Sequence, residues 1–397
     1  MDKLILPSTK EKKIKRKLTP KPAVKEPAVK EPEPIIKKDC NDVITIPQHV
    51  GTCWFNAILM SLLFSQYSYE LLLKKDYFIK NNNQDTENIK ELKKLLNSII
   101  KDYRLDRNKT YKYFEILRPE NILKLALPIE KYNQIVSEGY GYLFNIFYSV
   151  FLNILDIPHI HFDYYNKNFY YGISSNLKKD LDGSLILKYD DIFKSIKSFT
   201  SNKTPNPDYL IINLWDNLKN ESDFIFVEGY IQRTINKFGD NNTLKKSGIK
   251  YNGLDKFNDI ITYNGDTYKL DSCLLANYNK DFIKYRHAIC GITCDEEHYV
   301  YNGWVRRMTI DPSFIYDPTE VSKNIDDILP CELMKFDWNI KKKSSFCLNV
   351  DRCKLDFLYR GLDKRLNSQL CFSFDSGKRT IVYVKVNKEP AEKKKNI

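Results

Sequence analysis

The sequence predicts an α+β fold in which helices come first and a mostly antiparallel sheet follows. Residues 53–65, 85–100 and 142–155 have the apolar content or the helical spacing of buried helices. After Pro158, runs of β-branched and aromatic residues lie between turn signals, which is typical of strands. This separation of helices from strands indicates an α+β architecture, and 397 residues suffice for two or three domains or for one large unit with a tail.

The composition indicates a folded, soluble protein. Apolar residues make up 42% of the chain and aromatic residues 13%. The longest apolar runs, 57–64 and 143–155, are shorter than the roughly 18 residues that a membrane span needs. Nine cysteines form no dense, regular framework and no secretory signal is evident, so we expect a reducing, cytoplasmic compartment and no membrane partner.

The positive charge is concentrated at the N-terminus. Of the net charge of +12, residues 1–39 supply +6, with 12 Lys and Arg against 6 Asp and Glu. The segment is rich in Lys, Glu and Pro and repeats Pro-Ala-Val-Lys-Glu at 22–26 and 27–31. We predict a disordered basic arm over residues 1–40, which acts as a solubilising spacer. Its run at 12–17 is an alternative candidate for nuclear targeting or polyanion contact.

The elements expected after the arm fall into one folded unit over residues 41–336. A short strand at 43–47 closes at Pro47, and the three helices follow. Residues 337–387 are expected to pack on this unit or to continue it, and residues 388–397 to form a disordered tail. The expected strands of the sheet are 159–165, 184–189, 209–214, 224–227, 268–275, 288–293 and 299–305.

The most informative segment is Pro-Gln-His-Val-Gly-Thr-Cys-Trp-Phe-Asn-Ala, residues 47–57. It places Cys53 at the start of a helix, where the helix dipole favours the thiolate that a catalytic cysteine needs. Gly51 permits a tight turn ahead of the helix. The amide of Gln48, together with the Cys53 N–H, is suited to bind the oxyanion of a tetrahedral intermediate. The alternative is an ordinary buried cysteine at the head of a core helix.

A thiol mechanism also needs a histidine that shuttles the proton, and the chain has five candidates. His49 is too close in sequence to Cys53 to face it from a separate element. His159 and His161 alternate on a predicted strand, where a structural role is favoured over a weak metal pair. His287 and His298 remain.

The segment 285–304 is predicted to be a β-hairpin that turns at Cys294 and Asp295. Thr293 then opposes Glu296, and counting outward places His287 opposite Asn302, on the same face of the hairpin. An Asn beside the base completes a Cys-His-Asn triad.

A second assignment takes His298 as the base and Asp317 as its orienting acid. Both assignments keep the base on the same hairpin. We favour His287 with Asn302. For either histidine, the alternative is a residue that only stabilises the sheet.

These residues resemble the cysteine and histidine boxes of the ubiquitin-specific proteases. That family has Gly-x-Thr-Cys-aromatic-x-Asn-Ala after an amide residue. Here Gln48 stands in place of its usual Asn, and Gly51 lies directly before Thr52 instead of two positions before it. The strands expected at 209–214 and 268–270 match the two that precede the family's histidine box, although its Gly-His-Tyr is absent at His287. The resemblance covers residues 48–304 and implies a papain-like fold.

The resemblance implies a thiol-dependent peptidase or isopeptidase, with ubiquitin conjugates as substrates. Because the Lys, Asn, Ile and Tyr excess is similar to that of large DNA viruses, an alternative is a viral protease that processes structural-protein precursors in host cytoplasm or virion. An inactive protease fold used as a binding or virion module is a further alternative. Without paired Cys-x-x-Cys motifs we expect neither zinc nor another cofactor.

Overall fold

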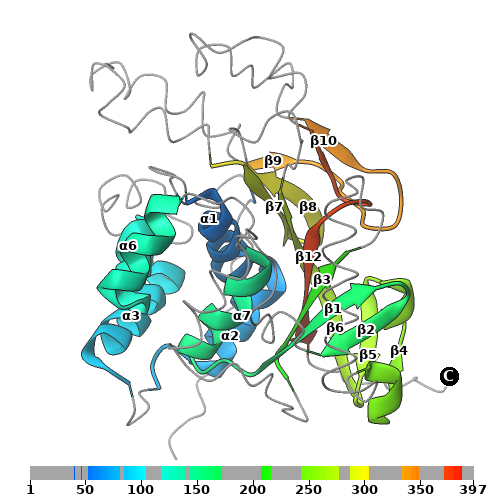
Figure 1. The fold of residues 1–397 in the computed structure, drawn as a ribbon, viewed down its shortest axis with the longest axis horizontal. Helices are drawn as coiled ribbons and strands as arrows, with labels where there is room; N and C mark the ends of the chain where they lie inside the picture. The colour runs from blue at the N-terminus through cyan, green and yellow to red at the C-terminus, as the bar shows by residue number, and fades with distance from the viewer. Residues whose placement is uncertain are drawn as a thin grey trace, which may run out of the picture. The chain divides into compact units, whose positions relative to one another are not determined.

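A computed structural model describes about half of the chain, and Figure 1 shows its fold. The chain divides between residues 37 and 38, so all of the described residues belong to one unit. The described residues are 40, 46, 52–80, 85–103, 118–138, 144–171, 207–215, 243–276, 287–303, 333–347 and 371–386.

A mixed sheet dominates the described part of the chain. All of its pairings are antiparallel except that between β1 and β3, so the expected fold class holds at the level of a mixed α/β protein with a mostly antiparallel sheet. Across the sheet the strands are β2 (Asn168–Tyr171), β1 (His159–Tyr165), β3 (Tyr209–Leu214), β12 (Arg379–Val386), β6 (Asp266–Ala276), β7 (Ala288–Cys294), β8 (Glu297–Tyr301) and β9 (Leu333–Lys335). β5 (Ile260–Tyr263) pairs with β6 and with β4 (Tyr251–Asn252), while β10 (Ser345–Cys347) and β11 (Cys371–Ser373) form a separate pair.

The apolar strands lie where the sequence predicts them. β1 and β3 coincide with 159–165 and 209–214, and β6 and β7 cover 268–275 and 288–293. β8 begins and ends earlier than the predicted strand 299–305, which extends beyond the described residues. The strands predicted at 43–47, 184–189 and 224–227 lie wholly or almost wholly outside the described residues.

The helices pack on one face of the sheet (Figure 1). The predicted helix 53–65 is an α-helix that continues without interruption as a π-helix, and the helices predicted at 85–100 and 142–155 are also present. The described helical segments are α1 (Cys53–Leu59), η2 (Met60–Phe64), α2 (Gln66–Lys75), α3 (Glu87–Ser98), η3 (Ile99–Tyr103), α5 (Pro119–Ala126), α6 (Ile129–Glu138) and α7 (Phe144–Ile154). No described helix has the length and apolar content that would let it cross a membrane.

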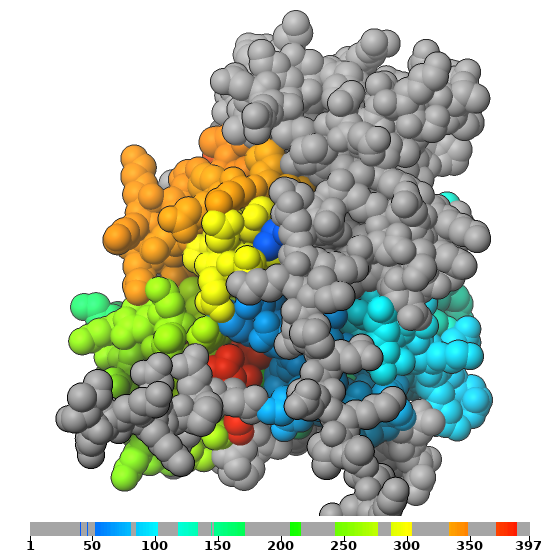
Figure 2. Space-filling model, turned by 180° about the vertical axis from the view of Figure 1, so that it is seen from behind, coloured from blue at the N-terminus to red at the C-terminus, as the bar shows by residue number. Residues whose placement is uncertain are grey.

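Two apolar clusters cover the two faces of the sheet. The first lies between the sheet and the helices and includes every apolar residue of α1 and η2. The second covers the opposite face and is closed by Trp338, Phe346 and Phe374 from the C-terminal part of the chain. In Figure 2, the orange surface of residues 333–347 adjoins the yellow surface of residues 287–303.

The C-terminal part of the chain belongs to the sheet itself. β12 lies between β3 and β6 and forms hydrogen bonds with both, so it is an interior strand. β9 extends the same sheet at its edge beside β8. The described part of the predicted C-terminal extension, 337–387, therefore continues the unit that begins before Cys53.

The β7–β8 hairpin turns one residue later than the sequence analysis predicts. Asp295 and Glu296 form the turn, with φ values of 49° and 62°, and Cys294 pairs with Glu297. Thr293 therefore opposes His298, and the predicted pairing of Thr293 with Glu296 is wrong. Both central residues of this kind of tight turn need positive φ, which Asp tolerates better than most residues.

Two disulfides link described residues, and the sequence analysis predicted neither. Cys40 bonds to Cys294 at the hairpin turn, across 254 positions of the chain. Cys347 bonds to Cys371, which lies directly opposite it in the β10–β11 pair. Such bonds persist in oxidising compartments, whereas the composition favours a reducing one, so the compartment stays a prediction.

Candidate active site

Cys53 is the first residue of α1. Thr52 is the N-cap, and its carbonyl oxygen accepts hydrogen bonds from the amides of Phe55 and Asn56, both at 2.9 Å. The first turn carries no acidic residue that would oppose a negative charge on the thiol. Cys53 is 3% exposed, so the protein covers nearly all of its surface.

Two hydrogen bonds fix how the helical segment that begins at Cys53 lies along the hairpin. Near its start, Asn56 Nδ2 donates to the hydroxyl of Tyr301 at 3.1 Å, and at its end Ser65 Oγ accepts from the Thr293 amide at 3.0 Å. The helix therefore runs in the direction of β7. Cys53 lies before Asn56 on the helix, and His287 and Asn302 lie beyond the paired part of the hairpin at the same end.

His287 and Asn302 are in contact at that end of the hairpin. The imidazole Nε2 lies 2.7 Å from the Asn302 Oδ1, and both residues are buried. The ring of Phe372 in β11 lies edge-on to the imidazole, with the ring centres 6.1 Å apart. Continued outward by one pair, the observed register places Ile289 opposite Asn302, so His287 contacts Asn302 diagonally and not directly across the hairpin. The predicted register was wrong by two residues. A shift of two residues keeps a side chain on the same face of the sheet, so the predicted contact between His287 and Asn302 is still present.

This hydrogen bond selects the tautomer of His287. A carbonyl oxygen can only accept, so Nε2 must carry a proton and donate it to Asn302. In the neutral ring Nδ1 is then the basic nitrogen. The pair therefore has the chemistry of an oriented general base.

Several predicted site residues lie outside the described residues. These are Gln48, His49, Gly51 and Asp317. The oxyanion role of Gln48 and the orienting role of Asp317 therefore stay predictions.

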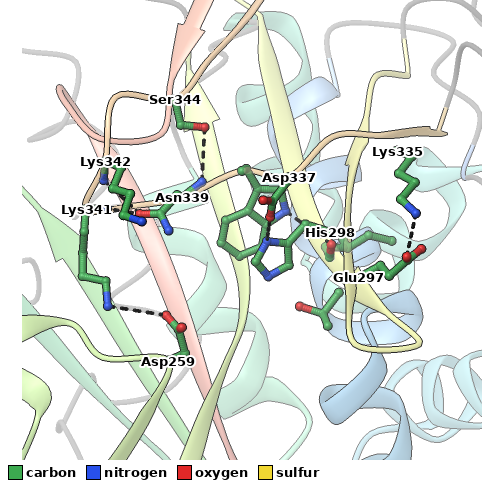
Figure 3. A network of polar contacts seen from close by, with 12 residues as sticks. Asp259, Glu297, His298, Lys335, Asp337, Asn339, Lys341, Lys342 and Ser344 are labelled. Atoms are coloured by element: carbon green, nitrogen blue, oxygen red, sulfur yellow. Dashed lines mark hydrogen bonds and ion pairs between the residues drawn. The ribbon is translucent and has the colours of Figure 1, made fainter.

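His298, the alternative base, occupies a different part of the hairpin. It opposes Thr293, so it lies at the Ser65 end of the helical segment, whereas Cys53 lies at the opposite end. Its ring stacks on Trp338 at 4.1 Å, and Nδ1 lies 3.2 Å from Asp337 (Figure 3). The described residues therefore do not bring His298 together with Cys53.

His159 and His161 serve the interior of the sheet. His159 Nδ1 lies 2.9 Å from the Ile157 carbonyl oxygen, and burial lowers the pKa of His159 to about 4. Asn213 Nδ2 donates to His161 Nε2 at 2.7 Å, and burial also lowers the pKa of His161. Both rings are therefore neutral at pH 7 and hydrogen-bonded within the protein, as the favoured structural role predicts.

Among the described residues, the two other cysteines outside the disulfides are less suited to catalysis than Cys53. Cys273 and Cys290 lie in the interior strands β6 and β7 and are fully buried. Burial raises the pKa of the Cys290 thiol well above its ordinary value. Among the described residues, no group of three or more His, Cys, Asp or Glu side chains is arranged to hold a metal ion.

Sequence reasoning missed two residues of this region, Asn56 and Tyr301. Their side chains join the nucleophile helix to the strand that ends beside Asn302. The available signal was the position of Asn56, one helical turn after Cys53, because a polar residue on the buried face of a helix needs a partner. No comparable signal marks Tyr301.

Comparison of the sequence with models of known protein families gives no match. Comparison with proteins of curated function gives none either.

Proposed function

We propose that the protein is a thiol-dependent peptidase of the papain-like class, with Cys53 as nucleophile and His287 as base. The observation that carries this proposal is the buried hydrogen bond between His287 Nε2 and Asn302 Oδ1. It lies at the end of the sheet where the helix of Cys53 begins. A nucleophile at a helix start and a base held by an amide are the parts that acyl transfer needs.

In the proposed reaction, His287 Nδ1 takes the proton of the Cys53 thiol and the thiolate attacks the substrate carbonyl. Asn302 holds the imidazole and stabilises the imidazolium through Nε2. The Cys53 amide and the Gln48 side chain donate to the oxyanion. The imidazolium then gives its proton to the departing amine, which leaves a thioester on Cys53. Water, deprotonated by His287, releases the acid and restores the thiol.

The order of elements supports the same class. The nucleophile lies on a helix that precedes the sheet, the base lies on an antiparallel strand, and its orienting residue follows on the next strand. Together with the cysteine box, this order favours a divergent relative of the ubiquitin-specific proteases. The proposed substrates are ubiquitin conjugates, and the alternative is structural-protein precursors of a virus. We place the protein in the cytoplasm, with the basic arm available to polyanions or for nuclear targeting.

The test is covalent capture of Cys53. Wild-type protein is incubated with ubiquitin carrying an electrophilic C-terminal group, beside the variants Cys53→Ala and Cys290→Ala, and adducts are read by intact mass. We expect an adduct on wild type and on Cys290→Ala, and none on Cys53→Ala. The Cys290 variant controls for reaction at a buried thiol of the adjoining sheet.

The possible results separate three functions. An adduct that depends on Cys53 supports a deubiquitinase. If ubiquitin gives no adduct but iodoacetamide alkylates Cys53 at mildly acidic pH, the peptidase proposal survives with another substrate. If neither reagent reacts with Cys53, the peptidase proposal fails and the inactive binding module replaces it.

A further inference from the structure

Three segments of the chain meet at the hydroxyl of Tyr301, the last residue of β8. This hydroxyl donates to the carbonyl oxygen of Ile46 at 2.5 Å and accepts from Asn56 Nδ2 at 3.1 Å. The Asn56 amide also lies 3.3 Å from the Ile46 oxygen. All three residues are at most 1% exposed, so the triangle of hydrogen bonds is sealed from water.

Each corner of this triangle lies close to a residue of the proposed reaction. Asn56 follows Cys53 by one helical turn, a rise of about 4.5 Å. Tyr301 directly precedes Asn302. Ile46 lies two positions before Gln48 in the segment that leads to the nucleophile.

Packing alone does not fix the position of the helix along the strand. All residues of α1 and η2 are buried. Hydrophobic burial has no direction, so a small slide along β7 would change the buried area little. Hydrogen bonds in a medium of low dielectric depend steeply on distance and angle, and they can select one position.

We propose that Tyr301 and Asn56 are positioning residues, which set the axial position of Cys53 against the His287 and Asn302 pair. This inference rests on the proposed function. Without the hydroxyl, the helix keeps its apolar contacts and the Ser65 hydrogen bond at its far end, but the end that carries Cys53 loses its connection to the strand that ends beside Asn302. The thiolate and the imidazolium then stabilise each other less, and the thiol needs a higher pH to ionise.

The test measures how fast iodoacetamide alkylates Cys53 between pH 5 and pH 9, with rates read by intact mass. Tyr301→Phe keeps the ring and removes both hydrogen bonds of the hydroxyl. We expect the pH at which its rate is half-maximal to rise by about one unit, so that its rate falls most at the acidic end of the range and approaches the wild-type rate at pH 9. Tyr299→Phe is the matched control, because Tyr299 lies two residues earlier on β8 and its hydroxyl lies 3.3 Å from Glu297 Oε2.

Asn56→Ala is the second variant, and it replaces Tyr301→Phe in this test if Tyr301→Phe does not fold. The double variant combines Tyr301→Phe with Asn56→Ala. Because the two side chains share one hydrogen bond, adding Asn56→Ala to Tyr301→Phe should lower the alkylation rate at pH 6 by a smaller factor than Asn56→Ala does in the wild type. An unchanged pH profile in a folded variant overturns the inference, and so does an equal loss at every pH. If wild-type Cys53 is inert at pH 6, the proposed function fails, which is a different result.

Discussion

At the scale of single residues, the hydrogen bond to His287 predicts that Asn302 orients the imidazole. Its amide oxygen holds Nε2 as the donor, so removing it frees the ring to rotate and to change tautomer. We expect Asn302→Ala to lower kcat/KM by about 100-fold, within the range for general-base catalysis, and Asn302→Asp to lose less because an acceptor remains. The measurement is steady-state hydrolysis of the substrate identified by covalent capture.

The matched control for this prediction is Asn213→Ala. Asn213 bonds to His161 at 2.7 Å in the interior of the sheet, so its loss should lower stability without changing kcat/KM per folded molecule. Equal activity of Asn302→Ala and wild type would contradict an orienting role.

Asp271 gives a pH-dependent contribution to stability. It is fully buried in β6, where Oδ1 accepts from the Tyr67 amide at 2.9 Å, and burial raises its pKa from 3.8 to about 7. Between these values the folded state holds a proton that the unfolded chain has released. The free energy of unfolding should therefore fall as pH rises through this window, by about 1.4 kcal/mol per pH unit at most.

Urea unfolding of wild type and Asp271→Asn at pH 5, 6, 7 and 8 tests this. The variant has no carboxyl to ionise, so its stability relative to wild type should increase with pH. Other titrating groups cancel in the difference between the two proteins. A difference that is constant with pH would contradict the shifted pKa.

The residue-scale results also show what the sequence could reveal. The helix start at Cys53 and the contact of His287 with Asn302 were predictable, because a helical apolar pattern and a two-residue turn are local signals. The turn was misplaced by one position, yet the contact was found because a shift of two in register keeps side chains on the same face. The triangle of hydrogen bonds among Tyr301, Asn56 and Ile46 was not predictable, because Tyr301 is 245 residues from Asn56 and 255 residues from Ile46 in the sequence.

At the scale of elements, Gly291 allows the C-terminal part of the chain to cover β7. A Cβ atom at this position would lie 2.7 Å from Phe374 Cε1 and 2.8 Å from Trp338 Nε1. We expect Gly291→Ala to lower the free energy of unfolding by about 1 to 3 kcal/mol through overpacking, measured by urea denaturation. Phe374→Leu in the same chain should recover part of the loss. Wild-type stability in Gly291→Ala alone would show that the stacked rings can move aside.

The apolar strands were the elements that the sequence predicted most directly. The central position of β12 in the sheet could not be predicted from the sequence. β1 and β3 are continuous buried runs with β-branched and aromatic residues, which the sequence shows directly. β12 has a similar composition, but its neighbours β3 and β6 are set by pairing across more than a hundred residues. Composition predicts a strand, and it does not predict which strands flank it.

At the scale of the whole molecule, the interior position of β12 predicts that the folded unit cannot end at residue 336. A chain that ends there lacks the strand between β3 and β6 and exposes unpaired edges on both. We expect no cooperative thermal transition by circular dichroism and aggregation by size-exclusion chromatography. A chain that ends at residue 387 keeps β12 and should behave like the full chain. A folded, monomeric 1–336 fragment would contradict the interior position of β12.

The two disulfides should differ in what they contribute to stability. The Cys40–Cys294 bond closes a loop of 254 residues and the Cys347–Cys371 bond one of 24. In the chain-entropy model these loops correspond to about 5.5 and about 3.5 kcal/mol. The pair Cys40→Ser with Cys294→Ser should therefore lower the urea midpoint more than the pair Cys347→Ser with Cys371→Ser. The opposite order would show that strain or residual structure outweighs loop length.

The interior position of β12 also has a consequence for biosynthesis. The sheet that carries His287 and Asn302 stays split between β3 and β6 until residues 379–386 have left the ribosome. Co-translational folding can form the nucleophile helix and the hairpin, but it cannot complete the sheet beneath them. The peptidase proposed above would therefore stay inactive on the ribosome, and the nascent chain and its neighbours would be protected from cleavage during synthesis.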